Sequence, residues 1–95
     1  MVEKGKGYFA TKGCVACHSA DGSKLIGPTL QGVYGSKVDL ADGSTALADD
    51  NYMKESIENP TAKVVKGFAP TMPPFKGILT EQEITALIAY IRSLK

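Results

Sequence analysis

Cys14-Val15-Ala16-Cys17-His18 is the stretch that decides how this chain folds. It holds both cysteines of the chain and its only histidine. The pattern C-x-x-C-H is the attachment signature of c-type haem, in which two sulfurs add to the porphyrin vinyl groups and the imidazole reaches the iron. A short helical turn places all three groups within reach of one macrocycle. The sequence therefore predicts one haem c, attached covalently through Cys14 and Cys17, with His18 as an axial iron ligand.

Other uses of this pentapeptide fit the sequence less well. A structural zinc site needs about four Cys or His ligands, so zinc would have to recruit carboxylates. A thioredoxin-like dithiol follows a strand, whereas a helical pattern ending at Gly13 precedes Cys14. A disulfide between Cys14 and Cys17 would close too small a loop to stabilise much. A redox dithiol and a metal site remain as minor alternatives.

Length and composition agree with one small domain, residues 1–95, built around a large apolar cofactor. Chains of this size bury only around 60% of their unfolded surface, and this one has no Trp, three Phe and four Tyr. A haem would supply much of the missing core. The formal net charge of +1 argues against nucleic acid or an anionic membrane as the main partner.

No stretch of the sequence predicts membrane insertion. The best apolar run, residues 86–91, is far shorter than the ~20 residues that span a bilayer. Residues 1–4 lack the apolar stretch of a secretory signal. Since haem c is normally attached outside the cytoplasm, we expect Met1 to begin a processed or excised segment.

Helical patterns occupy both ends of the chain. Residues 2–12 place Val2, Gly5 and Phe9 on one face. Because glycine costs a helix ~1 kcal/mol relative to alanine, Gly5 predicts the close approach of a second helix. Residues 80–83, Thr-Glu-Gln-Glu, form a capping box that opens the C-terminal helix. The apolar stripe of that helix is expected to meet the first one; it comprises Ile84, Leu87, Ile88, Ile91 and Leu94.

A third helix and a short hairpin are predicted in the middle of the chain. Asp49-Asp50 can cap the helix, and Asn59-Pro60 ends it. Asp42-Gly43 is a two-residue hairpin signal between alternating apolar residues. Residues 19–36 and 60–79 are rich in Gly, Pro, Ser and Lys, and long irregular segments of this kind need something to wrap. An enclosed haem would give these segments a surface to pack against.

The second axial ligand decides what the iron does. No second histidine exists, so a methionine is the candidate. Met1 lies at the terminus, and Met53 lies on the apolar face of the third helix, where gap-filling is the usual role of methionine. Met72 stands in Pro70-Thr71-Met72-Pro73-Pro74-Phe75, and these prolines reduce the freedom lost when its thioether is fixed. Met72 is the predicted ligand, and a thioether raises the reduction potential. Six-coordinate iron of high potential suits electron transfer.

The chain resembles a class I cytochrome c over nearly its whole length. This implies an all-α fold of three to four helices around a covalently bound haem, with a very short β-hairpin near residues 38–47. The chain is most similar to the cytochrome c domain fused to subunit II of caa3-type oxidases, through residues 40–45 and the Met72-Pro73-Pro74-Phe75 segment. The wider likeness is carried by Gly5 and Phe9, Cys14-x-x-Cys17-His18, Gly27-Pro28-Thr29-Leu30, Tyr34-Gly35, Ile57-Glu58-Asn59-Pro60, Leu87 and Tyr90.

The resemblance also implies roles for individual residues. Pro28 would offer its carbonyl to the Nδ1-H of His18. Gly5 and Phe9 would meet Leu87 and Tyr90 where the terminal helices cross. The family often uses a tryptophan and a tyrosine near the haem propionates, and this chain has no tryptophan. The propionate partners therefore stay open, with Tyr34, Tyr52 and Lys66 as candidates.

The implied function is an electron relay, not catalysis by the chain itself. As an oxidase module, it would accept electrons from a redox protein and pass them to the copper-containing acceptor domain of its own subunit. It would be extracytoplasmic, tethered through a parent membrane subunit, and monomeric when isolated. A free periplasmic cytochrome c and a haem domain of another oxidoreductase share the same motifs. A ligand sensor or peroxidase would need an open sixth position, which Met72 argues against.

Overall fold

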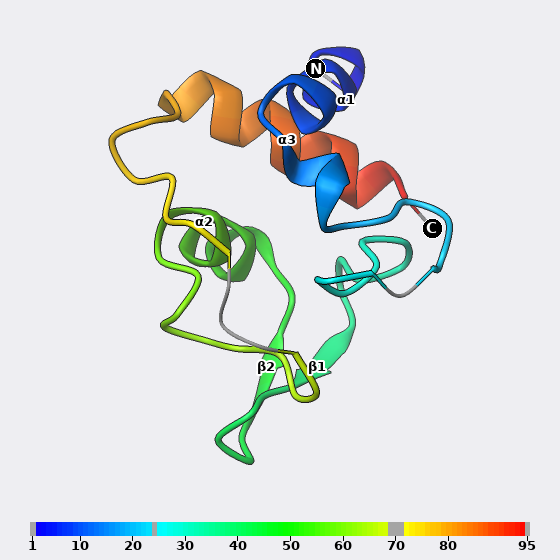
Figure 1. The fold of residues 1–95 in the computed structure, drawn as a ribbon, viewed down its shortest axis with the longest axis vertical. Helices are drawn as coiled ribbons and strands as arrows, with labels where there is room; N and C mark the ends of the chain where they lie inside the picture. Colours follow the sequence, from blue (N-terminus) through cyan, green and yellow to red (C-terminus); the bar gives the residue numbers. More distant parts are fainter. Residues whose placement is uncertain (1, 24, 69–71, 95) are drawn as a thin grey trace.

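The first and last helices of the chain cross against each other in the computed structural model, which describes residues 2–23, 25–68 and 72–94 (Figure 1). Met1, Pro70 and Thr71 thus lie outside the described residues. Helix α1 spans Val2–Thr11 and α3 spans Glu81–Ser93. A Cβ atom on Gly5 would lie 2.0 Å from the carbonyl oxygen of Ala86, so the two backbones are in direct contact.

Aromatic packing completes this crossing. The rings of Phe9 and Tyr90 have centroids 5.5 Å apart in a tilted arrangement, and Leu87 is buried in the same core. The predicted meeting of the two terminal helices is confirmed. Val2 differs from its prediction, because 43% of it is exposed and only Gly5 and Phe9 of α1 are buried.

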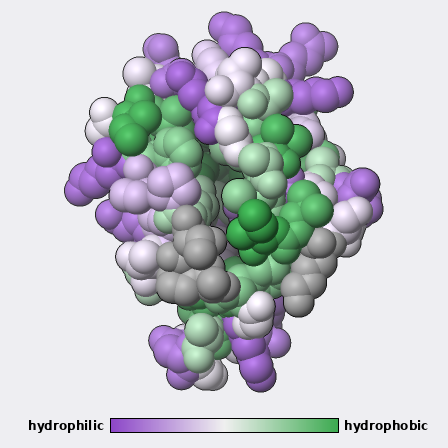
Figure 2. Space-filling model, in the orientation of Figure 1, coloured by the Kyte–Doolittle hydropathy of each residue, from purple (hydrophilic) through white to green (hydrophobic). Residues whose placement is uncertain are grey.

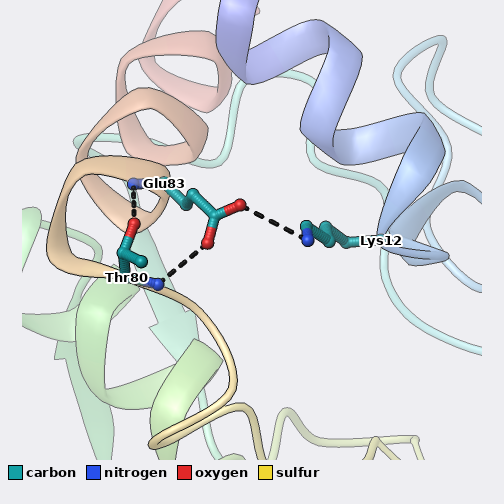
Figure 3. Close-up of polar contacts among 3 residues, drawn as sticks. All are labelled: Lys12, Thr80 and Glu83. Carbon is teal, nitrogen blue, oxygen red and sulfur yellow. Dashed lines mark hydrogen bonds and ion pairs between the residues drawn. The ribbon is translucent and has the colours of Figure 1, made fainter.

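The capping box at the start of α3 also holds α1 in place (Figure 3). The backbone N–H of Glu83 donates to the Thr80 hydroxyl at 3.1 Å, and the N–H of Thr80 donates to the Glu83 carboxylate at 2.9 Å. The other carboxylate oxygen lies 3.3 Å from the Lys12 ammonium. One side chain therefore satisfies a helix end and ties it to the segment that precedes Cys14.

This arrangement predicts an acid-sensitive contribution to stability. The backbone N–H of Thr80, then the Lys12 ammonium, hold the pKa of Glu83 below its ordinary value. A carboxyl group whose pKa is lowered by folding stabilises the protein above its unfolded-state pKa, and that stability is lost as pH falls through the lowered value. Glu83→Gln keeps a capping acceptor but removes the charge. Denaturant unfolding should show the variant less stable near pH 7, with the difference vanishing in acid; a difference that persists in acid would contradict this.

Helix α2 spans Asp50–Glu58 and begins at the predicted cap. The Asp49 carboxylate accepts the backbone N–H of Tyr52 at 2.9 Å. One face of α2 is buried, through Tyr52, Met53 and Ile57. In Figure 1 this helix lies on the other side of the molecule's centre from the α1–α3 pair.

The hairpin forms where the sequence predicts one, but its turn is longer by one residue. Strands β1 (Lys37–Asp39) and β2 (Thr45–Leu47) are antiparallel, with Val38 opposite Ala46. The Leu40 N–H donates to the Ser44 carbonyl at 2.9 Å, which leaves three residues in the turn. Gly43 takes the left-handed φ of 90° that such a turn requires. The predicted two-residue turn is therefore wrong.

Backbone hydrogen bonds order the segments that carry little regular structure. Residues 64–66 pair with the hairpin, through Ala41 N–H to the Val64 carbonyl (2.8 Å) and Lys66 N–H to the Asp39 carbonyl (2.9 Å). The Phe75 N–H donates to the Ile57 carbonyl at 3.1 Å, which attaches the segment after Met72 to the end of α2. Within the described ranges, no helix has the length and apolarity that a membrane crossing requires.

Candidate haem site

A cavity of about 450 Å³ lies between the terminal helices on one side and α2 with the irregular segments on the other. Figure 2 shows hydrophobic side chains gathered around a hollow on this face, with hydrophilic ones around the edge of the view. Its lining is mostly apolar, as is usual for sites that enclose a cofactor. The cavity brings together all five site residues singled out from the sequence: Cys14, Cys17, His18, Pro28 and Met72.

The two thiols are presented by a single turn. Gly13, with a left-handed φ of 82°, follows α1 and directly precedes the 3-10 helix η1, Cys14–Ala16. The N–H groups of Cys17 and His18 both donate to the Cys14 carbonyl, at 3.2 and 3.0 Å. This turn holds the three side chains of the pentapeptide at the cavity wall, with both cysteines half-buried and free of any disulfide.

The electrostatics of Cys14 argue against a redox dithiol. Burial raises the pKa of the Cys14 thiol, and the neighbouring Cys17 adds to the increase. A reactive dithiol needs the opposite, because the thiolate is the nucleophile and its pKa is lowered in such sites. A buried, neutral thiol beside an apolar cavity instead suits a sulfur that ends as a thioether.

Residues 27–28 contact the imidazole of His18 and fix its orientation. Its Nδ1 lies 2.8 Å from the Pro28 carbonyl oxygen, which leaves Nε2 free of that contact. The Gly27 N–H donates to the Cys17 carbonyl at 2.8 Å. A Cβ atom on Gly27 would lie 2.6 Å from Cε1 of the His18 ring, so only glycine allows the backbone to pass this close. The loop thus sets both the tilt of the ring and the nitrogen that carries its proton.

Two methionines border the cavity. Met72 is half-buried and follows the part of the chain outside the described residues, and the exposed Pro73 and Pro74 come directly after it. Met53 comes from α2, is 4% exposed and belongs to the hydrophobic core. Both methionines therefore line the same cavity as His18, one from α2 and one from the segment before Phe75.

One polar group in the cavity wall lacks a partner. The Oγ atom of Ser56, on α2, is buried without a hydrogen bond in the described part of the chain. A buried hydroxyl that stays unpaired costs about 1–3 kcal/mol, so its position fits a cavity that receives a group with polar atoms. The sequence offered only a weak signal for Ser56, namely a hydroxyl on the apolar face of a helix.

Comparison with known proteins settles which family has this arrangement. The family model for cytochrome c matches residues 2–95. The chain belongs to the cytochrome c family. Cytochrome c2 iso-1 of Magnetospirillum molischianum is 32% identical over an alignment of 92 positions that covers 86% of this chain and 90% of that protein. The structure of cytochrome cH from Methylobacterium extorquens superposes with a TM-score of 0.70 at 27% identity, covering 97% of each chain.

A third relative is part of a larger protein. The cbb3-type cytochrome c oxidase subunit CcoP of Helicobacter pylori (strain 52) is 30% identical over an alignment of 96 positions that covers 100% of this chain but 28% of that subunit. Family membership and the fold identify this chain as a class I cytochrome c, an electron-transfer protein that carries one covalently attached haem c. The cavity and the Cys14–Cys17 spacing fit that cofactor.

Proposed function

We propose that the chain transfers electrons through a haem held by five of its residues. Cys14 and Cys17 would supply the thioethers, and His18 and Met72 would hold the iron. The Pro28 carbonyl accepts a hydrogen bond from the Nδ1–H of His18, which would leave Nε2 for the metal. The observation that carries this proposal is the single cavity lined by all five residues, with the imidazole held 2.8 Å from the Pro28 carbonyl.

The protein's contribution to electron transfer is rigidity and an apolar setting. The bound haem supplies the one-electron chemistry. The η1 turn, residues 27–28 and the backbone bond from Phe75 to Ile57 hold the proposed ligands on separately anchored segments. Little movement is then needed between oxidation states, and the apolar wall excludes water. The chain performs no other chemistry in this proposal.

The parent system that we propose is a caa3-type oxidase, in which this module would serve subunit II. It would accept electrons from a redox protein and pass them to the copper-containing domain of that subunit, on the outer face of the cytoplasmic membrane. The supporting observations are the resemblance carried by residues 40–45 and 72–75 and the occurrence of a related domain within a longer oxidase subunit.

A free-standing periplasmic carrier is the second candidate. It is favoured by the cytochrome c2 relative, of which the alignment covers 90%. Stopped-flow mixing of the reduced protein with a soluble copper domain of a caa3 oxidase separates the two. Rapid oxidation by that domain, and slow oxidation by a mononuclear copper protein of similar potential, supports the oxidase module. Equal rates with both would favour the free carrier.

Absorption spectra of the oxidised and reduced protein test the haem site itself. We expect a low-spin haem c spectrum, the weak red band of an iron–thioether bond in the oxidised state, and pigment that stays with the polypeptide after denaturation in acid. Carbon monoxide should fail to bind the reduced protein. A colourless protein, or a reduced form that binds carbon monoxide readily, would overturn the proposed ligation.

Replacing Gly27 tests how the imidazole is held. In Gly27→Ala the new methyl group would overlap Cε1 and Nδ1 of His18, at 2.6 and 2.9 Å, so ring and loop must separate. Overpacking costs about 1–3 kcal/mol, and we expect the free energy of unfolding of the haem protein to fall by about 2 kcal/mol. Weaker donation to Pro28 makes the imidazole less basic and should raise the reduction potential. Leu25→Ala changes an exposed neighbour and is the control. If both variants change the free energy of unfolding and the reduction potential equally, this explanation is contradicted.

A further inference from the structure

Pro28 lies in the loop that follows His18, and hydrogen bonds attach this part of the loop to the residues on both sides of the histidine. One end is anchored at the Cys17 carbonyl, and at the other end the Leu30 N–H donates to the Ser19 carbonyl at 2.9 Å. Between these anchors the Pro28 carbonyl oxygen lies 2.8 Å from Nδ1 of His18. The contact with the imidazole therefore comes from the middle of a short, doubly anchored stretch.

The direction of the Pro28 carbonyl depends on few backbone torsions. The proline ring fixes φ of this residue, and the peptide group that joins it to Thr29 is planar. Only ψ of Pro28 is left to turn the carbonyl, and such a turn moves Thr29 unless the next torsion compensates for it. A group that holds Thr29 in place therefore also holds the carbonyl oxygen on the imidazole of His18.

The hydroxyl of Thr29 contacts three backbone groups of the same loop. It accepts the N–H of Gly22 at 3.1 Å and the N–H of Gln31 at 3.2 Å, and it donates to the Ser19 carbonyl at 3.4 Å. A threonine hydroxyl has one donor and two acceptor sites, so all of its hydrogen-bonding capacity is used here. The last of these bonds attaches Thr29 to the residue next to the proposed iron ligand.

The bend around Gly22 is shaped to reach this hydroxyl. Gly22 has a left-handed φ of 94°, and a Cβ atom on it would lie 3.0 Å from Oε1 of Gln31. The Asp21 carboxylate accepts the Ser23 N–H at 3.0 Å, and the Ser19 hydroxyl donates to the Ser23 carbonyl at 2.5 Å. These bonds hold the bend against the second half of the loop.

We propose that the Thr29 hydroxyl is a positioning group that keeps the Pro28 carbonyl on Nδ1 of His18 and thereby lowers the reduction potential of the iron. Donation from Nδ1–H makes an imidazole ligand more basic, and a more basic ligand favours ferric iron. Without the hydroxyl, the exposed residues Gly22 and Gln31 can bond to water through their N–H groups, so the carbonyl gains freedom at little cost in stability. This inference rests on the proposed ligation of iron by His18.

Thr29→Val tests the proposal with a side chain of nearly the same shape that lacks the hydroxyl. The equilibrium constant for reduction should rise about threefold, as expected when part of one hydrogen bond is lost, which is about 28 mV for one electron. Thr29→Ser keeps a hydroxyl and should stay close to the wild type. Thr85→Val is the matched control: its hydroxyl donates to the Glu81 carbonyl at 2.8 Å on an exposed part of α3, and its loss should leave the potential unchanged.

Hydrogen exchange, measured by NMR on the reduced haem protein, supplies a second readout. The Nδ1–H of His18 should exchange roughly threefold faster in Thr29→Val than in the wild type, because the Pro28 carbonyl holds it less firmly. The backbone N–H of Tyr90, a buried residue at the helix crossing, should exchange at the wild-type rate, because its exchange reports the opening of the folded core.

Three results on the haem protein would overturn the proposal. Wild-type potential and wild-type Nδ1–H exchange in Thr29→Val would remove the positioning role and leave the proposed function intact. Equal shifts in Thr29→Val and Thr29→Ser would exclude the hydroxyl as their cause. Exchange at Tyr90 that accelerates by the same factor as at His18 would identify a general loosening of the fold. A wild-type protein without covalent haem would instead remove the proposed function itself.

Discussion

Gly5→Ala should unfold at a temperature roughly 10–20 °C lower than the wild type. The added Cβ would lie 2.0 Å from the Ala86 carbonyl oxygen and 2.7 Å from the Tyr90 Cβ, so α1 must move away from α3. Alanine favours the helix by ~1 kcal/mol, but we expect the separation to cost more, for a net loss of about 2–3 kcal/mol. Thermal unfolding of the haem protein, followed by far-UV circular dichroism, measures this change.

The same helix provides a matched control of opposite sign. Gly7 has nothing within 4 Å of the position that its Cβ would occupy. Gly7→Ala therefore gains helix propensity without a clash and should stabilise the protein by up to ~1 kcal/mol. Should both variants shift the transition in the same direction, close packing at the helix crossing would not be the reason for glycine at position 5.

Met72→Ala should convert the iron to a form with an open or water-filled position. Its red absorption band should disappear, the reduced protein should bind carbon monoxide, and the potential should fall by on the order of 100 mV or more, since axial ligands set haem potentials over roughly 0.8 V. Loss of a thioether removes the donor that favours ferrous iron. Spectroscopy and redox titration of the variant give all three quantities.

Met53→Leu is the control for this experiment. The substitution keeps the buried volume of a residue that is 4% exposed, so it should cost less than about 1.5 kcal/mol and leave the spectrum unchanged. If Met53→Leu loses the red band while Met72→Ala keeps it, the methionine on α2 is the ligand and the proposed ligation is wrong.

The sequence predicted those elements whose signals come from neighbouring residues and fit only one local structure. The Thr80–Glu83 capping box and the Asp49 cap form as expected, because each needs only residues within one turn. Gly5 indicated a close helix contact, because glycine destabilises a helix relative to alanine and packing against a second helix compensates for that loss. Its partner was inferred from a single apolar stripe, and the structure confirms that pairing.

The turn of the hairpin shows where a local signal was insufficient. An Asp-Gly pair fits both two-residue and three-residue turns. The Asp42 carboxylate accepts the Ser44 N–H at 2.9 Å and the Ser44 hydroxyl at 2.6 Å. The N–H that a two-residue turn would pair across the strands is therefore already used. The register shifts accordingly, and Leu47 points outward with 57% of it exposed.

Other site features depend on contacts between distant segments and could not be obtained from one sequence. Residues 64–66 pair with the hairpin, about 25 positions earlier in the chain, and Val65 of this segment lines the cavity. The unpaired hydroxyl of Ser56 becomes informative only when the cavity beside it is known. Residue types identify the proposed ligands for haem. The tertiary fold determines the surroundings that set the reduction potential of the haem.

The crossing of α1 with α3 has a consequence for the order in which the molecule folds. Cys14, Cys17 and His18 stand more than 60 residues before Glu81–Ser93, the helix that packs on Gly5 and Phe9. Contacts this distant in sequence form late because closing a long loop costs entropy. The turn that carries both thiols is held by hydrogen bonds from Cys17 and His18 to Cys14, so it can form before the two terminal helices meet.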